Sequence, residues 1–517
     1  MWENNIYLAL QGVIASLMFL GTVLSFSRSG PGIWQSARNV LGFSFALALL
    51  LTVWNVSTQS PSFSTVISIM LMLVSFVGYI VVRFSQQYLQ GERGQPRFAG
   101  LLMLVFCAVT FVIISNHMVV MLAAWVIVSL ALHKLLMFYP QRPRAALAAH
   151  KKFIFARMAE LSLLAAFILL FNVHNTWSIS ELLSHYSANY VLSSQEQIAA
   201  VLIALTALIK CAQLPVHGWL IQVVEAPTPV SAALHGGVIN MGGFLLLSFA
   251  PLLALSSVAK WLLLIVAGIS MVIAALIMTT RISVKVRLAW STSAQMGMML
   301  VECALGLYEL ALLHLVAHSL YKAHAFLTAG DAVNNYADQA AAVNKMPSIS
   351  HWLQAFVLSI LLVSGLVVVA NYFELLLSTA VSPWLLLTLA FTVLIAERHS
   401  QFDSVPLHLV VSKALLLGST YLTLKLLISH YVIAPSFSIS VWADIWISAL
   451  FILLFGGYLI QKYALHKAWV RRINLYLYAG LYLDEWATRI TLKLWPVRLP
   501  KRMFAKRKQS VSQESWS

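Results

Sequence analysis

Residues 198–215 read IAAVLIALTALIKCAQLP, a run of twelve uncharged residues that ends at Lys210 and is closed by Pro215. Such a run is typical of a membrane-spanning helix. A charge at the centre of a bilayer costs about 2.5–3.5 kcal/mol, so it is retained only with a partner, water or a function. The proline breaks the helix beside the lysine, and broken helices at this depth line a cavity or pack inside protein. We therefore predict that Lys210 carries protons inside a helical bundle; the alternative is that its amine reaches the bilayer surface.

The composition of the whole chain indicates the same environment. Of its 517 residues, 60% are hydrophobic and 10% are charged, whereas a soluble domain carries about 25% charged residues. We predict an all-α fold, a polytopic transmembrane bundle of about 15 spans with discontinuous helices. The approximate centres of the spans are Leu17, Leu47, Leu73, Phe106, Val128, Leu163, Ala204, Gly237, Gly268, Met298, Val316, Leu361, Leu389, Leu416 and Ile452.

Basic residues alternate between the loops as the positive-inside rule predicts. Odd-numbered loops carry almost all of them, and Lys260 is the visible exception on an even one. The N-terminus is therefore expected outside and the tail after Lys462 inside. The first apolar run, from Ile6 to Phe26, has no signal-peptide cleavage pattern and is expected to remain as a helix. The basic residues of the odd loops are Arg28, Arg38, Arg83, Arg93, Arg97, Arg142, Arg144, Lys151, Lys152, Arg281, Lys285, Arg287, Lys345 and Arg398.

The chain divides into four expected parts. Residues 1–97 hold N-terminal transmembrane helices, 98–345 a core with the broken helices, 346–461 C-terminal transmembrane helices, and 462–517 a basic cytoplasmic tail. The tail mixes Trp and Tyr with Arg and Lys, which is typical of an amphipathic segment at a membrane surface. It is either a lipid anchor or a docking surface for a soluble partner.

A second group of ionisable residues lies in LHLVAHSLYK, residues 313–322. His314, His318 and Lys322 are four residues apart, so they lie along one face of one helix, about 6 Å from each other. Three such groups in an apolar segment form a plausible proton relay. A metal site and unrelated packing residues are the alternatives. His324 falls on another face.

Three further candidates surround the broken helices. After the break at Pro215, the next helix is expected to begin at Ala226-Pro227-Thr228-Pro229. His235 lies on that helix, next to two glycines, and we expect it to connect the Lys210 and His314 groups or to pack as a hydrogen-bonded residue. Glu160 lies one turn after Arg157 and is expected to pair with it. Glu225 precedes Ala226-Pro227 and is a candidate counter-charge for Lys210.

Several classes of protein are excluded by what the sequence lacks. The three cysteines, Cys107, Cys211 and Cys303, lie in apolar segments with no metal-ligand or disulfide spacing. We therefore expect no metal and no cofactor in this chain. It also lacks the glycine patterns of nucleotide-binding enzymes and the nucleophile elbow of hydrolases. The net charge of +16 indicates basic loops against anionic lipid rather than nucleic acid.

Two segments resemble the antiporter-like subunits of respiratory complex I and of Mrp cation/proton antiporters. Residues 209–244 match their K-S-A-Q-x-P…W-L…P-T-P-V-S-A-x-x-H pattern, and residues 288–327 match L-A-Y-S-T-x-S-Q-x-G followed by H-x-x-x-H-x-x-x-K. A weaker match runs from Trp125 to Glu160. The resemblance implies that Lys210 is the lysine of the first channel, that His235 is the histidine of the following helix, and that His314, His318 and Lys322 form the central relay.

The departures from this pattern concern both channels. In the complex I subunits a glutamate follows the tryptophan that corresponds to Trp125, and here the residue is Val126. His133 and Lys134, one to two turns on, are expected to compensate. In the second half, Tyr372 stands at the family's lysine position in residues 369–376, which predicts an altered or missing second channel.

These departures resemble one branch, the DabB membrane subunits of two-component inorganic carbon accumulators in the bacterial inner membrane. The resemblance implies a cation-conducting, non-enzymatic subunit that works with a large soluble DabA-type subunit on the cytoplasmic face. That partner resembles a carbonic anhydrase, holds zinc and hydrates carbon dioxide to bicarbonate. The alternatives are a proton-pumping subunit of an NADH-quinone oxidoreductase-like or Mrp-type complex and a membrane anchor without transport.

Overall fold

The computed structural model describes residues 2–27, 30, 32–58, 62–139, 141–332, 346–372, 380–401, 406–431 and 440–496. Within these ranges the fold consists of helices, and the only extended pairing is a single bridge between His117 and Ser178. The predicted all-α class is therefore confirmed. Arg28, Lys345 and the tail beyond residue 496 lie outside the described residues.

The first half of the chain forms long helices and then a series of short ones. The long helices are α1 (Trp2–Ser27), α2 (Gly32–Ser57), α3 (Ser62–Tyr88), α4 (Gln95–Ile114), α5 (Met118–Leu136) and α6 (Pro143–His174). The series that follows consists of α7 (Ile179–Ser184), α8 (Ser194–Lys210), α9 (Gly218–Gln222), η1 (Val223–Glu225), α10 (Thr228–Gly236), η2 (Val238–Asn240), α11 (Met241–Ser248) and α12 (Ala250–Leu255).

The second half returns to long helices and ends in a short amphipathic tail. Its elements are α13 (Ser257–Thr279), α14 (Val284–Ala304), α15 (Tyr308–Leu327), η3 (Ala329–Asp331), α17 (Ile349–Tyr372), α18 (Ser382–Gln401), α19 (Leu407–Tyr431), α20 (Val441–Tyr463), α21 (Ala468–Tyr478), η4 (Gly480–Tyr482) and α22 (Glu485–Leu494).

Eleven segments among the described residues are long and apolar enough to cross a membrane, so the chain is a multi-pass membrane protein. Each of the fifteen predicted centres lies on a helix, apart from Gly237, which lies at the break between α10 and η2. Four of those helices, α8, α14, α15 and α18, are not among the eleven. The count of about 15 spans therefore stays a prediction.

The break after α8 is held by polar groups of α13 and α14. The backbone N–H of Leu214 donates to the Ser270 hydroxyl at 3.0 Å, and the Ser293 hydroxyl donates to the carbonyl of Ala212 at 2.9 Å. The Gln213 amide donates to the carbonyls of Cys211 and Ser293 at 2.8 and 3.1 Å. Helix packing thus satisfies the backbone groups that the break releases, which is the condition for irregular backbone at membrane depth.

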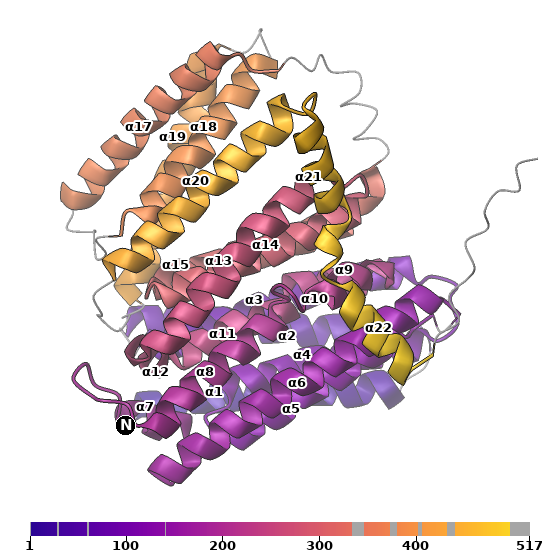
Figure 1. Cartoon of the computed structure of the whole chain (residues 1–517). Helices are drawn as coiled ribbons and strands as arrows, with labels where there is room; N and C mark the ends of the chain where they lie inside the picture. Colours follow the sequence, from indigo (N-terminus) through magenta and orange to yellow (C-terminus); the bar gives the residue numbers. More distant parts are fainter. Residues whose placement is uncertain are drawn as a thin grey trace, which may run out of the picture.

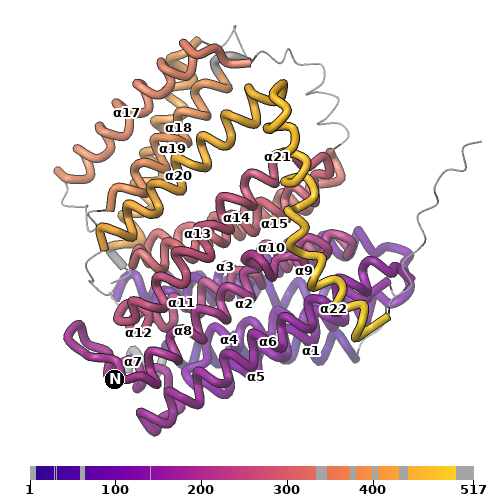
Figure 2. Tube along the Cα trace, viewed as in Figure 1, coloured from indigo at the N-terminus to yellow at the C-terminus, as the bar shows by residue number. Residues whose placement is uncertain are grey.

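The helices form two packed groups with the tail across one end (Figures 1 and 2). Helices α1–α15 share one large apolar core, while α17, α18 and α19 pack around a smaller core of their own. Helix α20 contacts both α13 and α18 and so joins the groups. From the end of α20 the chain continues through α21 and α22, and α22 lies against α6. The bundle therefore places the tail beside the short helices of the break.

Candidate functional site

A buried ion pair forms where α8 breaks. The Lys210 Nζ lies 3.0 Å from Glu160 Oε1, and the other carboxylate oxygen of Glu160 lies 2.6 Å from an Arg157 guanidinium nitrogen. The Lys210 amine also lies 5.4 Å from the centre of the Trp125 ring. The predicted Arg157–Glu160 pair is confirmed. One carboxylate therefore serves two cations, and a buried carboxylate between cations stabilises their charged forms.

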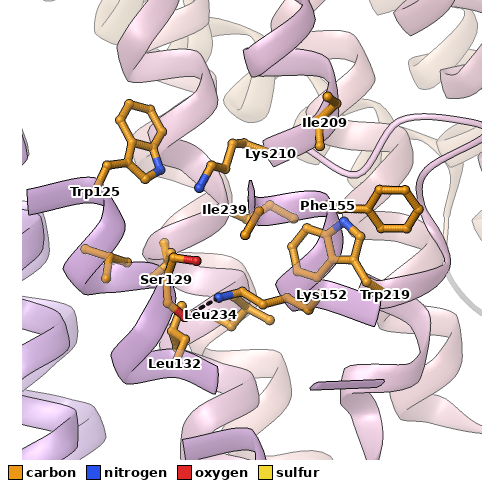
Figure 3. A pocket seen from close by; sticks show the side chains of 13 residues that line it. Trp125, Ser129, Leu132, Lys152, Phe155, Ile209, Lys210, Trp219, Leu234 and Ile239 are labelled. Atoms are coloured by element: carbon orange, nitrogen blue, oxygen red, sulfur yellow. Dashed lines mark hydrogen bonds between the residues drawn. The ribbon is translucent and has the colours of Figure 1, made fainter. Parts of the chain in front are cut away.

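A cavity of about 30 Å³ lies beside this ion pair, and we call it the lysine cavity. Its walls come from α5, α6, the end of α8, α9 and α10–η2. The volume exceeds the 10–15 Å³ that one water molecule needs. Figure 3 shows the amines of Lys210 and Lys152 entering it from different helices and pointing toward Trp125 and Ser129 of α5. The lining residues are Trp125, Val128, Ser129, Leu132, Lys152, Phe155, Ala156, Ile209, Lys210, Trp219, Leu234, Val238 and Ile239.

Lys152 was missed as a site residue. The sequence placed Lys151 and Lys152 in a basic loop, but both lie in α6 with buried side chains, so that placement is wrong. The Lys152 amine donates to the carbonyl of Ser129 at 2.8 Å. The sequence spacing could have identified Lys152, because residues 152, 156 and 160 share one helix face. The spacing of Lys152 to Glu160 therefore equals that of His314 to Lys322.

His235 lies on the other side of the wall that α10 gives to the lysine cavity. Its neighbour Leu234 lines the cavity, while the His235 ring stacks on Phe326 and its Nδ1 lies 3.1 Å from the Thr292 hydroxyl. That hydroxyl donates to the carbonyl of Leu288, so Nδ1 is the donor and Nε2 carries the lone pair. Nε2 is buried without a hydrogen-bond partner among the described residues. It is thus an acceptor available to a proton.

The predicted row on α15 is present as a geometric feature. His314 Nδ1 lies 3.1 Å from Glu302 Oε2, and the rings of His314 and His318 are 6.2 Å apart. Both ring nitrogens of His318 are buried and lack a partner within the described part of the chain. The Lys322 amine donates to the Ser291 hydroxyl at 2.7 Å and to the carbonyl of Leu288 at 3.2 Å. Buried nitrogens without a hydrogen-bond partner are costly, and a bridging water molecule is the smallest group that would satisfy them.

Other predicted residues lie away from these groups. Glu225 pairs at 3.8 Å with Arg144, and both side chains are largely exposed. Its predicted pairing with Lys210 is therefore wrong, because Glu160 occupies that place. His133 contacts the carbonyl of Ala149 at 3.1 Å and the ring of His150, and Lys134 is exposed on α5. Neither contacts Lys210, so the compensation for Val126 comes from α6. His324 is exposed, as its position on another helix face predicts.

The described residues offer no candidate for a bound metal ion. No group of three His, Cys, Asp or Glu side chains is placed to hold one in this part of the chain. The three cysteines are buried and unbridged. The polar groups of the site are therefore two lysines and a carboxylate around a small cavity, and a histidine row beside it.

Known proteins resemble this chain over most of its length. The family model "NADH:quinone oxidoreductase/Mrp antiporter, TM" matches residues 115–396. A probable inorganic carbon transporter subunit DabB of Hydrogenovibrio crunogenus is 46% identical over 509 residues, 97% of either chain. The probable subunit DabB2 of Halothiobacillus neapolitanus is 36% identical over 84% of this chain and 80% of its own.

Two solved structures share the fold. The Mrp complex from Dietzia superimposes with a TM-score of 0.56 at 19% identity, over 95% of this chain and 57% of the other. An archaeal respiratory membrane complex, the membrane-bound sulfane sulfur reductase, gives a TM-score of 0.57 at 14% identity, over 94% and 98% of the two chains. At these identities the likeness concerns the arrangement of helices.

Proposed function

The chain belongs to the NADH:quinone oxidoreductase/Mrp antiporter transmembrane family and, within it, to the DabB-type subunits; from this premise we propose that it conducts protons as the membrane subunit of an inorganic carbon transporter. The observation that carries the proposal is the buried Lys210–Glu160 pair beside a water-sized cavity. A lysine held against a carboxylate at bilayer depth can release and regain a proton when the pair separates. The DabB relative, similar over almost its whole length, supports inorganic carbon as the cargo of the complex.

The row on α15 supplies a second set of proton-carrying groups. By the predicted topology, α15 begins outside and ends inside, so the Glu302–His314 pair lies nearer the outside than Lys322. A proton moving inward passes from this pair through His318 to the region of Lys322 and His235. The spacing of residues 314–322 predicted this row but not its buried acid, Glu302. The two unpartnered nitrogens of His318 suit a relay that water completes.

The partner in this proposal is a large soluble DabA-type subunit at the cytoplasmic face, which holds zinc and hydrates carbon dioxide. Downhill proton flow through the membrane subunit biases that hydration, so that bicarbonate accumulates inside. The present chain carries no catalytic step of its own and acts as a transporter subunit in the bacterial inner membrane, with its N-terminus periplasmic and its tail cytoplasmic. The basic and aromatic tail faces the side where the partner docks.

The runner-up function is a proton-pumping subunit of an NADH-quinone oxidoreductase-like or Mrp-type complex, favoured by the family match across residues 115–396. The two functions differ in their use of the proton gradient. The first consumes a proton gradient, whereas the second generates one or exchanges protons for another cation. Co-purification separates them, because the first requires a soluble zinc protein and the second requires further membrane subunits.

The test is growth of a bacterium that needs elevated carbon dioxide unless it expresses this chain with its partner. Lys210→Ala should abolish growth in air while the membrane level of the protein, measured by immunoblot, stays normal. Lys413→Ala is the matched control, since Lys413 is exposed on α19, and it should grow as the parent. Normal growth of the Lys210 variant in air would reject the proposal.

A further inference from the structure

The tail segment, residues 468–494, is joined to the cytoplasmic end of the bundle by a carboxylate. The Asp484 Oδ2 lies 2.6 Å from the Lys151 amine, which also donates to the Thr488 hydroxyl at 2.7 Å. The Gln222 amide, at the end of α9, donates to the same oxygen at 3.0 Å. The Lys151 side chain is fully buried under these contacts. A tail acid therefore supplies the only charged partner that the structure gives this buried lysine among the described residues.

The same contacts lie directly against the wall of the lysine cavity. Lys151 precedes Lys152, whose amine enters the cavity, on α6. The Trp486 ring packs edge-on against Phe155, another wall residue, at 5.9 Å. The α9 residue before the wall residue Trp219 is Gly218, where a Cβ would overlap the Asp484 carboxyl. One wall residue, Phe155, thus contacts the tail directly. Two others, Lys152 and Trp219, each follow a residue that lies against Asp484.

The backbone between α21 and α22 is bent to bring Asp484 to this place. Gly480, Leu481 and Tyr482 all have positive φ, at 69°, 54° and 57°. This conformation is unfavourable for residues with a side chain, and it persists where surrounding contacts determine it. One such contact is the Arg281 guanidinium, which donates to the carbonyl of Leu477 at 3.3 Å and lies over the Tyr478 ring. The turn is therefore a formed element.

We propose that the tail segment closes the cytoplasmic end of the lysine cavity and that Asp484 is the positioning residue that holds it closed through Lys151. In this arrangement, whatever binds the tail gains control over access to Lys152 and Lys210. The consequence for transport rests on the proposed function, but the closure itself does not.

The closure is one that can be reversed. Burial raises the pKa of the Asp484 carboxyl, and the Lys151 ammonium together with the hydrogen bond from Thr488 lowers it by less. For the Asp484 carboxylate, removal from water therefore outweighs the stabilisation that Lys151 and Thr488 give its charge. A buried pair of this kind fixes a geometry more than it adds stability. A partner that competes for the tail can consequently release it.

The test measures access to the cavity directly. Ser129 lines the cavity, so Ser129→Cys reports entry of a small cationic thiol reagent added to the cytoplasmic side of inside-out vesicles. The full chain is expressed with its partner, and Cys107, Cys211 and Cys303 are changed to alanine in the background. With the tail in place, residue 129 should react slowly. Asp484→Asn and Lys151→Gln should each raise the labelling rate of the cysteine at position 129 about ten-fold or more. Each change removes one charge of the buried pair and leaves the other without its counter-charge.

Two further variants show whether the pair acts as a unit. Asp484→Asn combined with Lys151→Gln should react no faster than the faster single variant, since both changes open the same contact. Glu485→Gln is the matched control: this acid is next in the chain but exposed and paired with Arg489 at 3.2 Å, and its rate should equal the parent's.

Unchanged rates in the Asp484 and Lys151 variants, an equal increase in the Glu485 variant, or multiplied rates in the double variant would each overturn the closure. The labelling rate does not depend on transport. Lys210→Ala with the parent tail should label slowly while failing to support growth. Growth of that variant would reject the proposed function and leave the labelling result standing.

Discussion

Glu160 lies on α6, whereas the acid that the family resemblance leads one to expect follows the tryptophan on α5, where this chain has Val126. The structure brings Glu160 within 3.0 Å of Lys210 and leaves Trp125 as the α5 neighbour of the same amine. Both helices line the cavity beside the lysine, α5 through Trp125, Val128, Ser129 and Leu132. Lys210 thus has a carboxylate partner, and that partner comes from α6.

This replacement predicts a rescue. Glu160→Gln should lower proton-coupled carbon uptake at least about ten-fold, because it leaves the Lys210 amine and the partly exposed Arg157 guanidinium without their carboxylate. Adding Val126→Glu should restore a measurable part of that uptake by returning an acid to the α5 side. The measurement is bicarbonate accumulation in cells with equal amounts of membrane protein. Full uptake by the single variant would show that the pair is only structural, and Glu92→Gln, an exposed acid, controls for the loss of a carboxylate.

Some of these residues could be found from spacing and some could not. Lys210 follows an uncharged run, and His314, His318 and Lys322 recur every fourth residue, so the sequence alone marks them. The partner of Lys210 depends on how α6 packs against α8, which no local pattern encodes. Glu225 looked suitable because it is near the break in sequence, yet it faces Arg144 at the surface. Lys152 was not recognised as a site residue because the positive-inside rule assigned it, with other basic residues, to a loop.

Among the helices, α9 is short but holds the tail and the cavity wall together. Its first residue, Gly218, has no room for a side chain beside Asp484, and its second, Trp219, lines the lysine cavity. The sequence predicted a break at Pro215 and a restart at Ala226, and the structure fills that interval with α9 and η1. What the sequence could not predict is the role of serines on α13 and α14 in holding the break.

The close approach at α9 predicts a steric effect. Gly218→Ala should displace the Asp484 carboxyl and with it α22, because the added Cβ would occupy the position of the carboxylate. The accessibility of a cysteine at position 129 should rise about as far as it does in Asp484→Asn. Gly330→Ala, where nothing lies within 4 Å of an added Cβ, should leave it unchanged. An unaffected rate in the Gly218 variant would mean that the tail adjusts without opening.

Across the whole molecule, contacts join loops that the charge pattern assigns to the same side. Residues 116 and 117, after α4, pair with 178 and 179, after α6, and both connections are expected outside. At the opposite end, Arg281, in the connection after α13, contacts Leu477 of the tail. Two independent properties, loop charge and three-dimensional contact, therefore sort the loops in the same way.

That agreement predicts an odd number of membrane crossings. Alkaline phosphatase, which is active only outside, should be active when fused before Trp2 behind an export-competent leader or inserted at residue 188, in the connection after α7. A fluorescent protein that folds only in the cytoplasm should be bright at Gly330 and after residue 496, which follows α22. The helices α8, α14, α15 and α18, which are shorter or more polar than the other spans, are the ones whose crossing this pattern decides. If the two ends of the chain reported the same side, the number of crossings would be even. If the fusion after residue 496 reported the outside, the tail could not meet Lys151 from the cytoplasm, and both the closure and the assignment of the docking face would fail together.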